Sequence, residues 1–406
     1  MKQNPVKTCW AIMIATASLT QCVSAATFGD DTTFLKGHTD VIILSDKQGA
    51  AKVAVVPAWQ GRIMTSSSAG DAGFSYGWIN RELITSGRVV PHMNAFGGED
   101  RFWMGPEGGQ FSIFFEQGAK FEFANWFTPA IFDTLPFKVI STSGDQVVFG
   151  AKFALTNYSG TRFEIEVKRN VHLLDAAAAW KALEVPPVKD VSLVAYETDN
   201  RITNKGEQPW SKSSGLLSIW LLGMYKPTPT TTIVVPFKEG PEATLGPKVN
   251  DAYFGKVPPD YLIVKDHVLF FRGDGTRRGK IGISPARSLG MAGSYDAGGK
   301  VLTLVTCTVP ARHEGYVNSM WEIQKAPFGG DALNSYNDGS AEPGKPPMGP
   351  FYELETSSPA AALKPGAFIQ HVQRTIHLTG PQATLDAMAR AKLGVGLAEI
   401  TAAFGK

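Results

Sequence analysis

The chain has 406 residues, of which 43% are hydrophobic, and it carries 39 basic against 37 acidic residues. This balance excludes the strongly basic surface by which proteins bind nucleic acid or an anionic membrane. The 42 glycines, 26 prolines and 24 phenylalanines favour many strands joined by tight turns over a helical protein.

The first 25 residues resemble an export signal. Two lysines precede an apolar run at about residues 9–19, and small residues follow at positions 23–25. The run is too short to span a bilayer. We therefore expect cleavage near Ala25, a periplasmic or secreted protein, and no transmembrane segment. Lipid attachment at Cys22 is the alternative, but Gln21 stands where a small residue is usual.

Short β-branched or aromatic runs predict strands along the whole chain, and most of them alternate with polar residues. These runs lie at residues 41–44, 53–56, 111–115, 137–140, 146–149, 163–167, 191–196, 216–222, 231–235, 268–271 and 301–309. The segment around residues 352–356 adds another strand. The pattern is typical of a large, mostly antiparallel β-sandwich.

Only one helix is predicted, and it comes last, at about residues 381–404. Pro381 opens it, and Gly394 and Gly396 interrupt it. No Pro/Ser-rich linker, repeat of fixed period or block of like charges divides the chain. We therefore predict an all-β protein with one domain over residues 26–406.

Several short segments, in the same order, resemble motifs of the galactose mutarotase-like superfamily. They are residues 56–61 (VPAWQG), 96–103 (FGGEDRFW), 105–107 (GPE), 202–206 (ITNKG), 354–356 (LET) and 363–366 (LKPG). The resemblance implies a β-supersandwich that binds sugar rings on its concave face. It also implies that Glu355, within Leu-Glu-Thr, is the catalytic acid or base.

Two departures from the family pattern bear on the expected chemistry. Family mutarotases carry a histidine before the first Gly-Gly, where this chain has Phe96. They also carry an Asn-His pair after the central Thr-Asn, and no histidine follows Thr203-Asn204 at that place. The chain therefore resembles a divergent branch, marked by residues 336–339 (YNDG) and 352–356 (YELET). Hydrolysis and lyase chemistry then stand beside epimerisation as expected reactions.

The catalytic candidates are Glu355, Glu107 and His92. Glu353 and Glu355 lie two apart in an extended segment, so both point to the same face of a sheet. In a cavity, repulsion and burial would raise the pKa of at least one, as acid/base catalysis requires; on a solvated face both would be ordinary strand residues. We take Glu355 as the catalytic group, Glu107 as the second carboxylate that hydrolysis needs, and His92, near the Gly-Gly loop, as a further candidate.

The glycine-rich segment 96–109 carries Glu99, Arg101 and Trp103. Sugars stack their apolar faces on aromatic rings, and their hydroxyls bind charged groups. We therefore expect these three residues to bind substrate, with Arg101 able to neutralise a uronate in a lyase. The alternative is an internal Arg–Glu pair that holds a loop, with Trp103 in the core.

A second binding segment is expected at residues 331–339, as a loop facing the substrate. The candidates there and nearby are Trp321, Asp331, Tyr336, Asn337, Asp338 and Glu353. A simple turn at residues 337–339 is the alternative. The oxygen ligands do not have EF-hand spacing, and no histidine pair has zinc-ligand spacing. We therefore expect no cofactor, calcium is not indicated by any motif, and a metal stays unknown.

These patterns lead to three hypotheses about function. The first is an exported, carbohydrate-active enzyme with Glu355 as acid or base, in which hydrolysis, lyase chemistry and epimerisation stay open. The second is a glycan-binding protein without catalysis, which the missing histidines favour. The third is a structural envelope protein whose loops contact a partner. The ligand expected in the first two is a sugar or glycan, no nucleic acid is expected, and the oligomeric state is not predicted.

Overall fold

The computed structural model describes residues 26–340 and 344–405. The expected export signal, with the alternative lipid site at Cys22, lies outside the described residues. None of the helices in the described ranges has the length and apolar character needed to cross a membrane.

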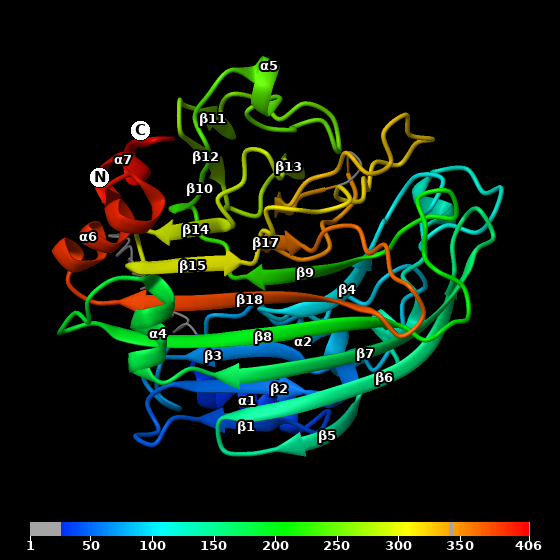
Figure 1. Cartoon of the computed structure of the whole chain (residues 1–406). Coiled ribbons are helices and arrows are strands. Elements are labelled where there is room, and N and C mark those ends of the chain that lie inside the picture. The colour runs from blue at the N-terminus through cyan, green and yellow to red at the C-terminus, as the bar shows by residue number, and fades with distance from the viewer. Residues whose placement is uncertain (1–25, 341–343, 406) are drawn as a thin grey trace, which may run out of the picture.

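Ten strands of the described chain form one large antiparallel sheet (Figure 1), in the order β11-β12-β10-β14-β15-β18-β8-β7-β6-β5. They are β5 (Lys138–Thr142), β6 (Gln146–Thr156), β7 (Arg162–Leu173), β8 (Ser192–Asn204), β10 (Thr231–Pro236), β11 (Leu262–Val264), β12 (Val268–Arg272), β14 (Met291–Asp296), β15 (Val301–Cys307) and β18 (Phe368–Thr379). The last strand in sequence, β18, lies in the middle of the sheet, because Gln373 is opposite Cys307 on one side and Thr198 on the other.

A smaller antiparallel sheet has the order β13-β16-β17-β9-β4 within the described residues. Its strands are β4 (Arg101–Gly105), β9 (Ser218–Tyr225), β13 (Gly279–Ile283), β16 (Leu333–Asn337) and β17 (Tyr352–Ser357). Across three of them, Lys280, Tyr336 and Glu353 are direct neighbours. On the other side of β17, Glu353 is opposite Met224 and Glu355 is opposite Leu222.

One face of the small sheet packs on the large sheet. Tyr225, Ile281 and Leu354 share a buried cluster with Val235 and Phe271 of the large sheet. Because side chains alternate along a strand, the residues between these three point to the opposite face. That opposite face carries the charged and aromatic residues of the site.

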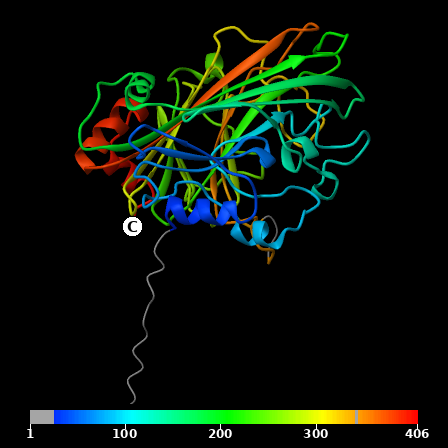
Figure 2. The ribbon, with the colours of Figure 1, turned by 90° about the horizontal axis from the view of Figure 1, so that it is seen from below.

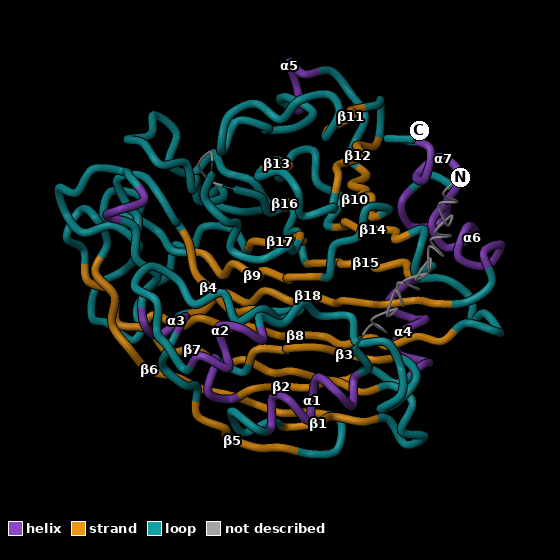
Figure 3. Tube along the Cα trace, turned by 180° about the vertical axis from the view of Figure 1, so that it is seen from behind, coloured by secondary structure: helices purple, strands orange, loops and turns teal. Residues whose placement is uncertain are grey.

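A three-stranded sheet consists of β1 (Ile42–Ser45), β2 (Lys52–Val56) and β3 (Arg62–Ser67). It packs in another buried cluster, with Phe102 of the small sheet and Phe149 of the large sheet. Two helices, α1 (Phe28–Lys36) and α2 (Arg81–Ser86), lie beside it, as the view from behind shows (Figure 3). Leu35 of α1 and Ile84 of α2 belong to one cluster with Met64 of β3.

The remaining helices are α3 (Ala130–Asp133), α4 (Ala176–Leu183), α5 (Glu242–Leu245), α6 (Gln382–Leu393) and α7 (Leu397–Ala402), with short 3₁₀ turns at Pro57–Trp59 and Phe123–Asn125. Figure 2 shows α4 and the C-terminal helices at the same end of the large sheet. Trp180 of α4 packs there in one cluster with Leu385 and Met388 of α6. The predicted C-terminal helix is thus confirmed, with its break at Gly394.

The predicted all-β sandwich is confirmed, but some local predictions were wrong. Residues 28–36 are helical, opened by a capping box of Thr27 and Asp30, and α4 begins after the capping residue Asp175. Residues 111–115 form turns rather than a strand, because Ser112 Oγ bonds the backbone around it. The expected loop at residues 331–339 contains strand β16.

Candidate functional site

A pocket lies on the face of the small sheet that carries the polar residues. Side chains from all five strands line it: Arg101, Trp103, Trp220, Lys280, Tyr336 and Glu353 are the ones that matter for its chemistry. Loops close its walls with Glu107, Trp126, Phe254, Arg278 and Trp321. Its empty space, counted together with the open mouth, is about 560 Å³.

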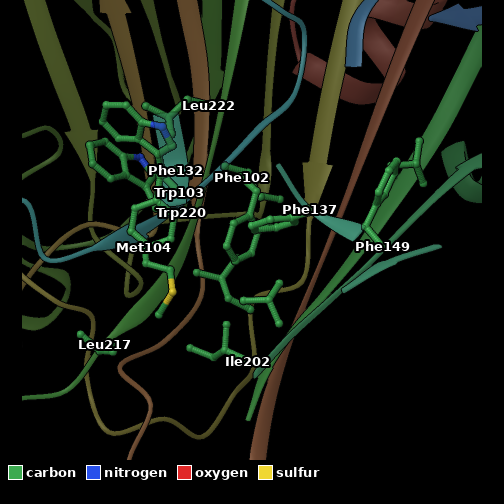
Figure 4. Close-up of a cluster of buried hydrophobic side chains, with 14 of the residues drawn as sticks. Phe102, Trp103, Met104, Phe132, Phe137, Phe149, Ile202, Leu217, Trp220 and Leu222 are labelled. Carbon is green, nitrogen blue, oxygen red and sulfur yellow. The ribbon is translucent and has the colours of Figure 1, made fainter. Parts of the chain in front are cut away.

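Four tryptophans form one wall of the pocket. Trp103 and Trp220 lie together, with ring centroids 5.5 Å apart and planes nearly perpendicular (Figure 4). Trp126 lies 6.4 Å from Trp103 and 6.0 Å from Trp321, and it stacks on the latter. This continuous indole surface suits the apolar face of a ring-shaped ligand.

Two buried ion pairs lie at the pocket floor. Arg101 Nη2 contacts Glu353 Oε1 at 2.5 Å, and the Arg101 guanidinium lies 5.0 Å from the Trp103 ring. Lys280 Nζ contacts Glu355 Oε2 at 2.9 Å, and the same oxygen accepts a hydrogen bond from Trp220 Nε1 at 2.9 Å. Each cation is therefore held between a carboxylate and an indole, since Lys280 Nζ also lies 4.7 Å from the Trp220 ring.

The pocket environment shifts the pKa values of its acids and of its lysine. Burial raises the pKa of Glu107, an effect that Lys280 opposes and the charge of Glu355 reinforces. Burial likewise raises the pKa of Glu353 against the effect of Arg101. Burial acts to lower the pKa of Lys280, but the negative charges of Glu355 and Glu107 outweigh it, so this pKa is raised. Lys280 therefore stays charged, and Glu107 holds its proton more tightly than an exposed glutamate does.

A second, polar cavity of about 310 Å³ adjoins the pocket, and Trp220 and Lys280 line both. Its other walls include Ser218, Tyr253, Asp331, Asn334 and Ser357. Glu355 is opposite Asn334 in one neighbouring strand and Leu222 in the other. Because Leu222 lines the pocket and Asn334 lines the cavity, Glu355 stands at the boundary between the two.

Two polar atoms at this boundary are buried without partners. Glu355 Oε1 and Ser218 Oγ make no hydrogen bond to any residue of the described chain. One oxygen of Glu355 is thus fixed by Lys280 and Trp220, and the other is uncommitted. A carboxylate in this state is oriented and still able to meet a ligand atom or a water molecule.

The structure brings together most of the residues predicted for the site. Arg101, Trp103, Glu107, Trp321, Tyr336 and Glu353 line the pocket, and Glu355 borders it. Glu353 and Glu355 share a face of β17, as their spacing predicts. The alternative is also met in part, because Arg101 forms an internal pair, although with Glu353, and Trp103 belongs to the main buried cluster while it lines the pocket.

Glu99 lies elsewhere, buried in the sandwich interior. Its carboxylate accepts hydrogen bonds from the Ser66 hydroxyl at 2.8 Å and the Tyr196 hydroxyl at 2.9 Å, and it contacts His377 Nε2 at 2.9 Å. Tyr76 stacks on the His377 ring. Every oxygen of Glu99 is committed to the core, so this residue does not reach the pocket, contrary to the expectation for a substrate contact.

Three further candidates support the pocket from outside. His92 Nδ1 lies 2.6 Å from the carbonyl oxygen of Trp126, so it holds the segment that carries that indole. Asn337 bonds the Gly275 amide at 2.8 Å and faces the neighbouring turn. Asp338 accepts the Tyr336 hydroxyl at 3.1 Å, and burial raises its pKa to about 6. None of the three lines the pocket.

Asp331 lines the polar cavity instead of a substrate loop. It accepts hydrogen bonds from the Tyr253 hydroxyl at 2.6 Å and from Asn250 at 3.1 Å. Gly282 is required beside it, because a Cβ there would lie 2.0 Å from Asp331 Oδ2. The described residues contain no group of three or more His, Cys, Asp or Glu side chains arranged to hold a metal ion.

Several pocket residues were not predicted, notably Trp126, Trp220, Arg278 and Lys280. Lys280 is a lone cation in an otherwise apolar strand, between Gly279 and Ile281, and such a residue must find a counter-charge when buried. That signal was available in the sequence. Trp220 carried none, because an indole in an apolar strand is ordinary core.

One protein family matches nearly all of the described chain. A family model described as "Family of unknown function (DUF6786)" matches residues 26–404. The chain belongs to this family. No curated protein matches it.

Solved structures similar to this DUF6786 chain include galactose mutarotase-like proteins. The Slr1438 protein from Synechocystis sp. PCC 6803 shares 14% identity at a TM-score of 0.49, over 84% of this chain and 96% of that one. A putative aldose 1-epimerase from Escherichia coli K12 shares 12% sequence identity at a TM-score of 0.48, and the match covers 84% of this chain and 99% of that one. A galactose mutarotase-like protein from Lactobacillus casei ATCC 334 shares 10% sequence identity at a TM-score of 0.46, and the match covers 83% of this chain and 100% of that one. At these identities the likeness concerns the fold and not the chemistry.

Proposed function

We propose that the pocket binds a carbohydrate and that the protein acts on it by acid/base catalysis. The observation that carries this proposal is the convergence of four indoles with Arg101, Glu107 and Glu353 at one pocket, with Glu355 at its border in contact with Lys280. Indoles offer stacking surfaces for the apolar faces of sugar rings, and charged groups bind the hydroxyls. An apolar pocket with a few convergent polar groups is the usual form of a small-molecule site.

Glu355 and Glu107 have environments that suit different roles. Lys280 and Trp220 both contact Glu355 Oε2, which stabilises a carboxylate and leaves Oε1 to act as base or nucleophile. Burial raises the pKa of Glu107 against the opposing effect of Lys280, and a carboxyl group with a raised pKa suits a proton donor. Two carboxyl groups in different environments are the arrangement by which glycosidases cleave sugar linkages. Among the three reactions considered, this pair supports hydrolysis best.

A lyase or an epimerase would use the same residues differently. In a lyase, Glu355 would remove a proton from the ring carbon beside a carboxylate, and a pocket arginine would stabilise the charge that develops. In an epimerase, the pair would move protons on the ring oxygen and the anomeric hydroxyl. The products differ, so one assay panel separates the three reactions.

A glycan-binding protein without catalysis is the second candidate, and a specific observation favours it. The Glu355 side chain is fully buried, and its contact with Lys280 closes the floor between the pocket and the polar cavity. A ligand that stacks on the indoles without displacing this contact would be held but not transformed.

The location of the protein is also a proposal. The residues at positions 1–25 support export to the periplasm or beyond. Mass spectrometry of the protein purified from its native host should give a mature chain that starts near Ala26. A chain that keeps Met1, or one lipidated at Cys22, would contradict this expectation.

The decisive experiment measures binding and turnover separately. Purified protein is incubated with a panel of oligosaccharides, and the products are scored as new reducing ends, unsaturated sugars or changed anomers. Binding is followed by tryptophan fluorescence, which the four indoles make sensitive. Glu355→Gln and Glu107→Gln should bind ligand but lose turnover by about 10²-fold or more, whereas Glu164→Gln, an exposed glutamate on β7, should keep both.

The outcomes distinguish the candidates. Binding with turnover that Glu355→Gln abolishes supports the enzyme. Binding without any product from the wild type supports the glycan-binding protein. If no glycan in a broad panel changes the fluorescence or releases heat on titration, both carbohydrate proposals fail.

A further inference from the structure

The unpartnered polar atoms of the pocket walls are mostly hydrogen-bond donors. Arg101 Nε, Trp103 Nε1 and Trp126 Nε1 are buried and have no acceptor among the described residues. All three side chains line the pocket and are more than nine-tenths buried. Buried donors are normally satisfied, so a ligand that supplies acceptor oxygens here would gain hydrogen bonds at little cost.

One cation of the pocket is left over after the ion pairs are assigned. Arg101 is paired with Glu353, and Lys280 is paired with Glu355. Arg278 lies within 4.0 Å of no carboxylate in the described part of the chain, although it too lines the pocket. Glu107 and Asp338 interact with Arg278 at longer range, and burial raises the pKa of both carboxyl groups, which weakens them as counter-charges.

Arg278 is also held in position. Its guanidinium lies 3.7 Å from the centroid of the Phe254 ring, and its charge acts to lower the pKa of the neighbouring Tyr336. Stacking fixes the plane of the guanidinium and leaves its edge free, which is how arginine presents two parallel N–H groups to an oxyanion. The side chain is half-buried, so it can meet a ligand that enters from the mouth of the pocket.

We propose that the ligand of this pocket is an acidic sugar, whose carboxylate, sulfate or phosphate group binds Arg278. The inference rests on the proposed carbohydrate-binding function and narrows it. The sugar ring lies against the indoles, the anionic group pairs with Arg278, and other ring oxygens accept the free N–H groups of Arg101, Trp103 and Trp126. An anion supplies acceptors without adding donors, which matches a wall on which donors are in excess.

The test compares ligands that differ only in charge. Short oligogalacturonates are titrated against the same oligosaccharides after methyl esterification, which removes the charge and keeps the rings. Sulfated and desulfated galactose oligosaccharides, and glucose 6-phosphate against glucose, form the other two arms. Affinities are measured by calorimetry and by tryptophan fluorescence, at low and at high salt.

The chain offers a matched control for Arg278. Arg277 precedes it, is exposed and does not line the pocket. Arg278→Gln should weaken binding of the charged sugar by about tenfold or more, in keeping with a hydrogen bond to a charged group. Arg277→Gln should leave that binding unchanged, and neither variant should alter binding of the neutral sugar. Added salt should weaken only the charged ligand.

The result can overturn the inference without touching the proposed function. Preferential binding of one charged ligand, lost in Arg278→Gln and kept in Arg277→Gln, supports the proposal and identifies the anionic group. Equal affinity for the charged and neutral members of all three pairs overturns it and leaves carbohydrate binding intact. If no member of any pair binds, the carbohydrate function itself fails. A thermal unfolding curve like that of the wild type shows that Arg278→Gln is folded.

Discussion

Removing the charge of Lys280 tests whether its contact with Glu355 holds the site together. The side chains of the pair are only 7% and 0% exposed. In Lys280→Met, a buried carboxylate keeps a single donor, the Trp220 indole. Breaking a buried ion pair on one side costs about 3–5 kcal/mol. With roughly 380 ordered residues, the entropy of unfolding is about 0.8 kcal/mol/K, so the melting temperature should fall by about 4–6 °C.

A double-mutant cycle makes the prediction specific. Glu355→Gln should cost about 2–3 kcal/mol, because it leaves the lysine without its carboxylate. The double variant Lys280→Met/Glu355→Gln leaves no unpaired charge at these two positions, so it should be more stable than the sum of the single losses by about 2 kcal/mol or more. Urea unfolding followed by circular dichroism measures all four proteins.

The control pair has the same chemistry at the surface. Lys265 and Glu399 form an ion pair with side chains 46% and 43% exposed, and Lys265→Met should cost less than about 1 kcal/mol. Additive effects of the two changes at Lys280 and Glu355, or a Lys280→Met loss as small as the surface one, would refute the reasoning.

Three further predictions concern the surroundings of the pocket. The pKa of Asp338 is about 6 against an ordinary 3.8, so its ionised form is disfavoured in the fold and wild-type stability should fall as pH rises through this window. Asp338→Asn should therefore gain up to about 3 kcal/mol relative to wild type between pH 4 and 7, and a pH-independent difference in urea unfolding would count against it. Gly282→Ala places a Cβ 2.0 Å from Asp331 Oδ2, so it should lower the free energy of unfolding by about 1–3 kcal/mol. An unchanged melting temperature would show that the side chains around the cavity rearrange to make room for the methyl group. His92→Ala removes the contact with the Trp126 carbonyl and should speed amide hydrogen exchange around residues 121–129, whereas unchanged exchange would mean that the segment is held by other contacts.

The sequence predicts the strands better than it predicts their partners. Alternation marks the long strands β6, β7 and β8, because one face of each is buried. Nothing local indicates that β18 is inserted between β15 and β8, since pairing is decided by contacts between distant segments. The Asn, Asp and Gly content of residues 331–339 predicts a loop, whereas β16 forms there with β13 and β17 on either side.

The same limit applies to the site. The spacing of Glu353 and Glu355 is local information, so their shared face could be predicted. Lys280, Trp220 and Arg101 meet these acids only through the register of neighbouring strands, which no spacing along the chain reveals. Glu99 shows the opposite error, because a buried polar core residue and a substrate ligand have the same residue type.

The central place of the last two strands has a consequence for how the protein folds. β17 separates β9 from β16, and β18 separates β15 from β8, so any chain that has not yet added them has two divided sheets with open edges. Such edges pair readily with other chains, and contacts this distant in sequence form slowly. Arg101 and Lys280 also lack their counter-charges until β17 is in place, because β17 carries both Glu353 and Glu355. The pocket is therefore incomplete until β17 has joined the small sheet, and a chain that lacks these two strands exposes the edges that favour aggregation.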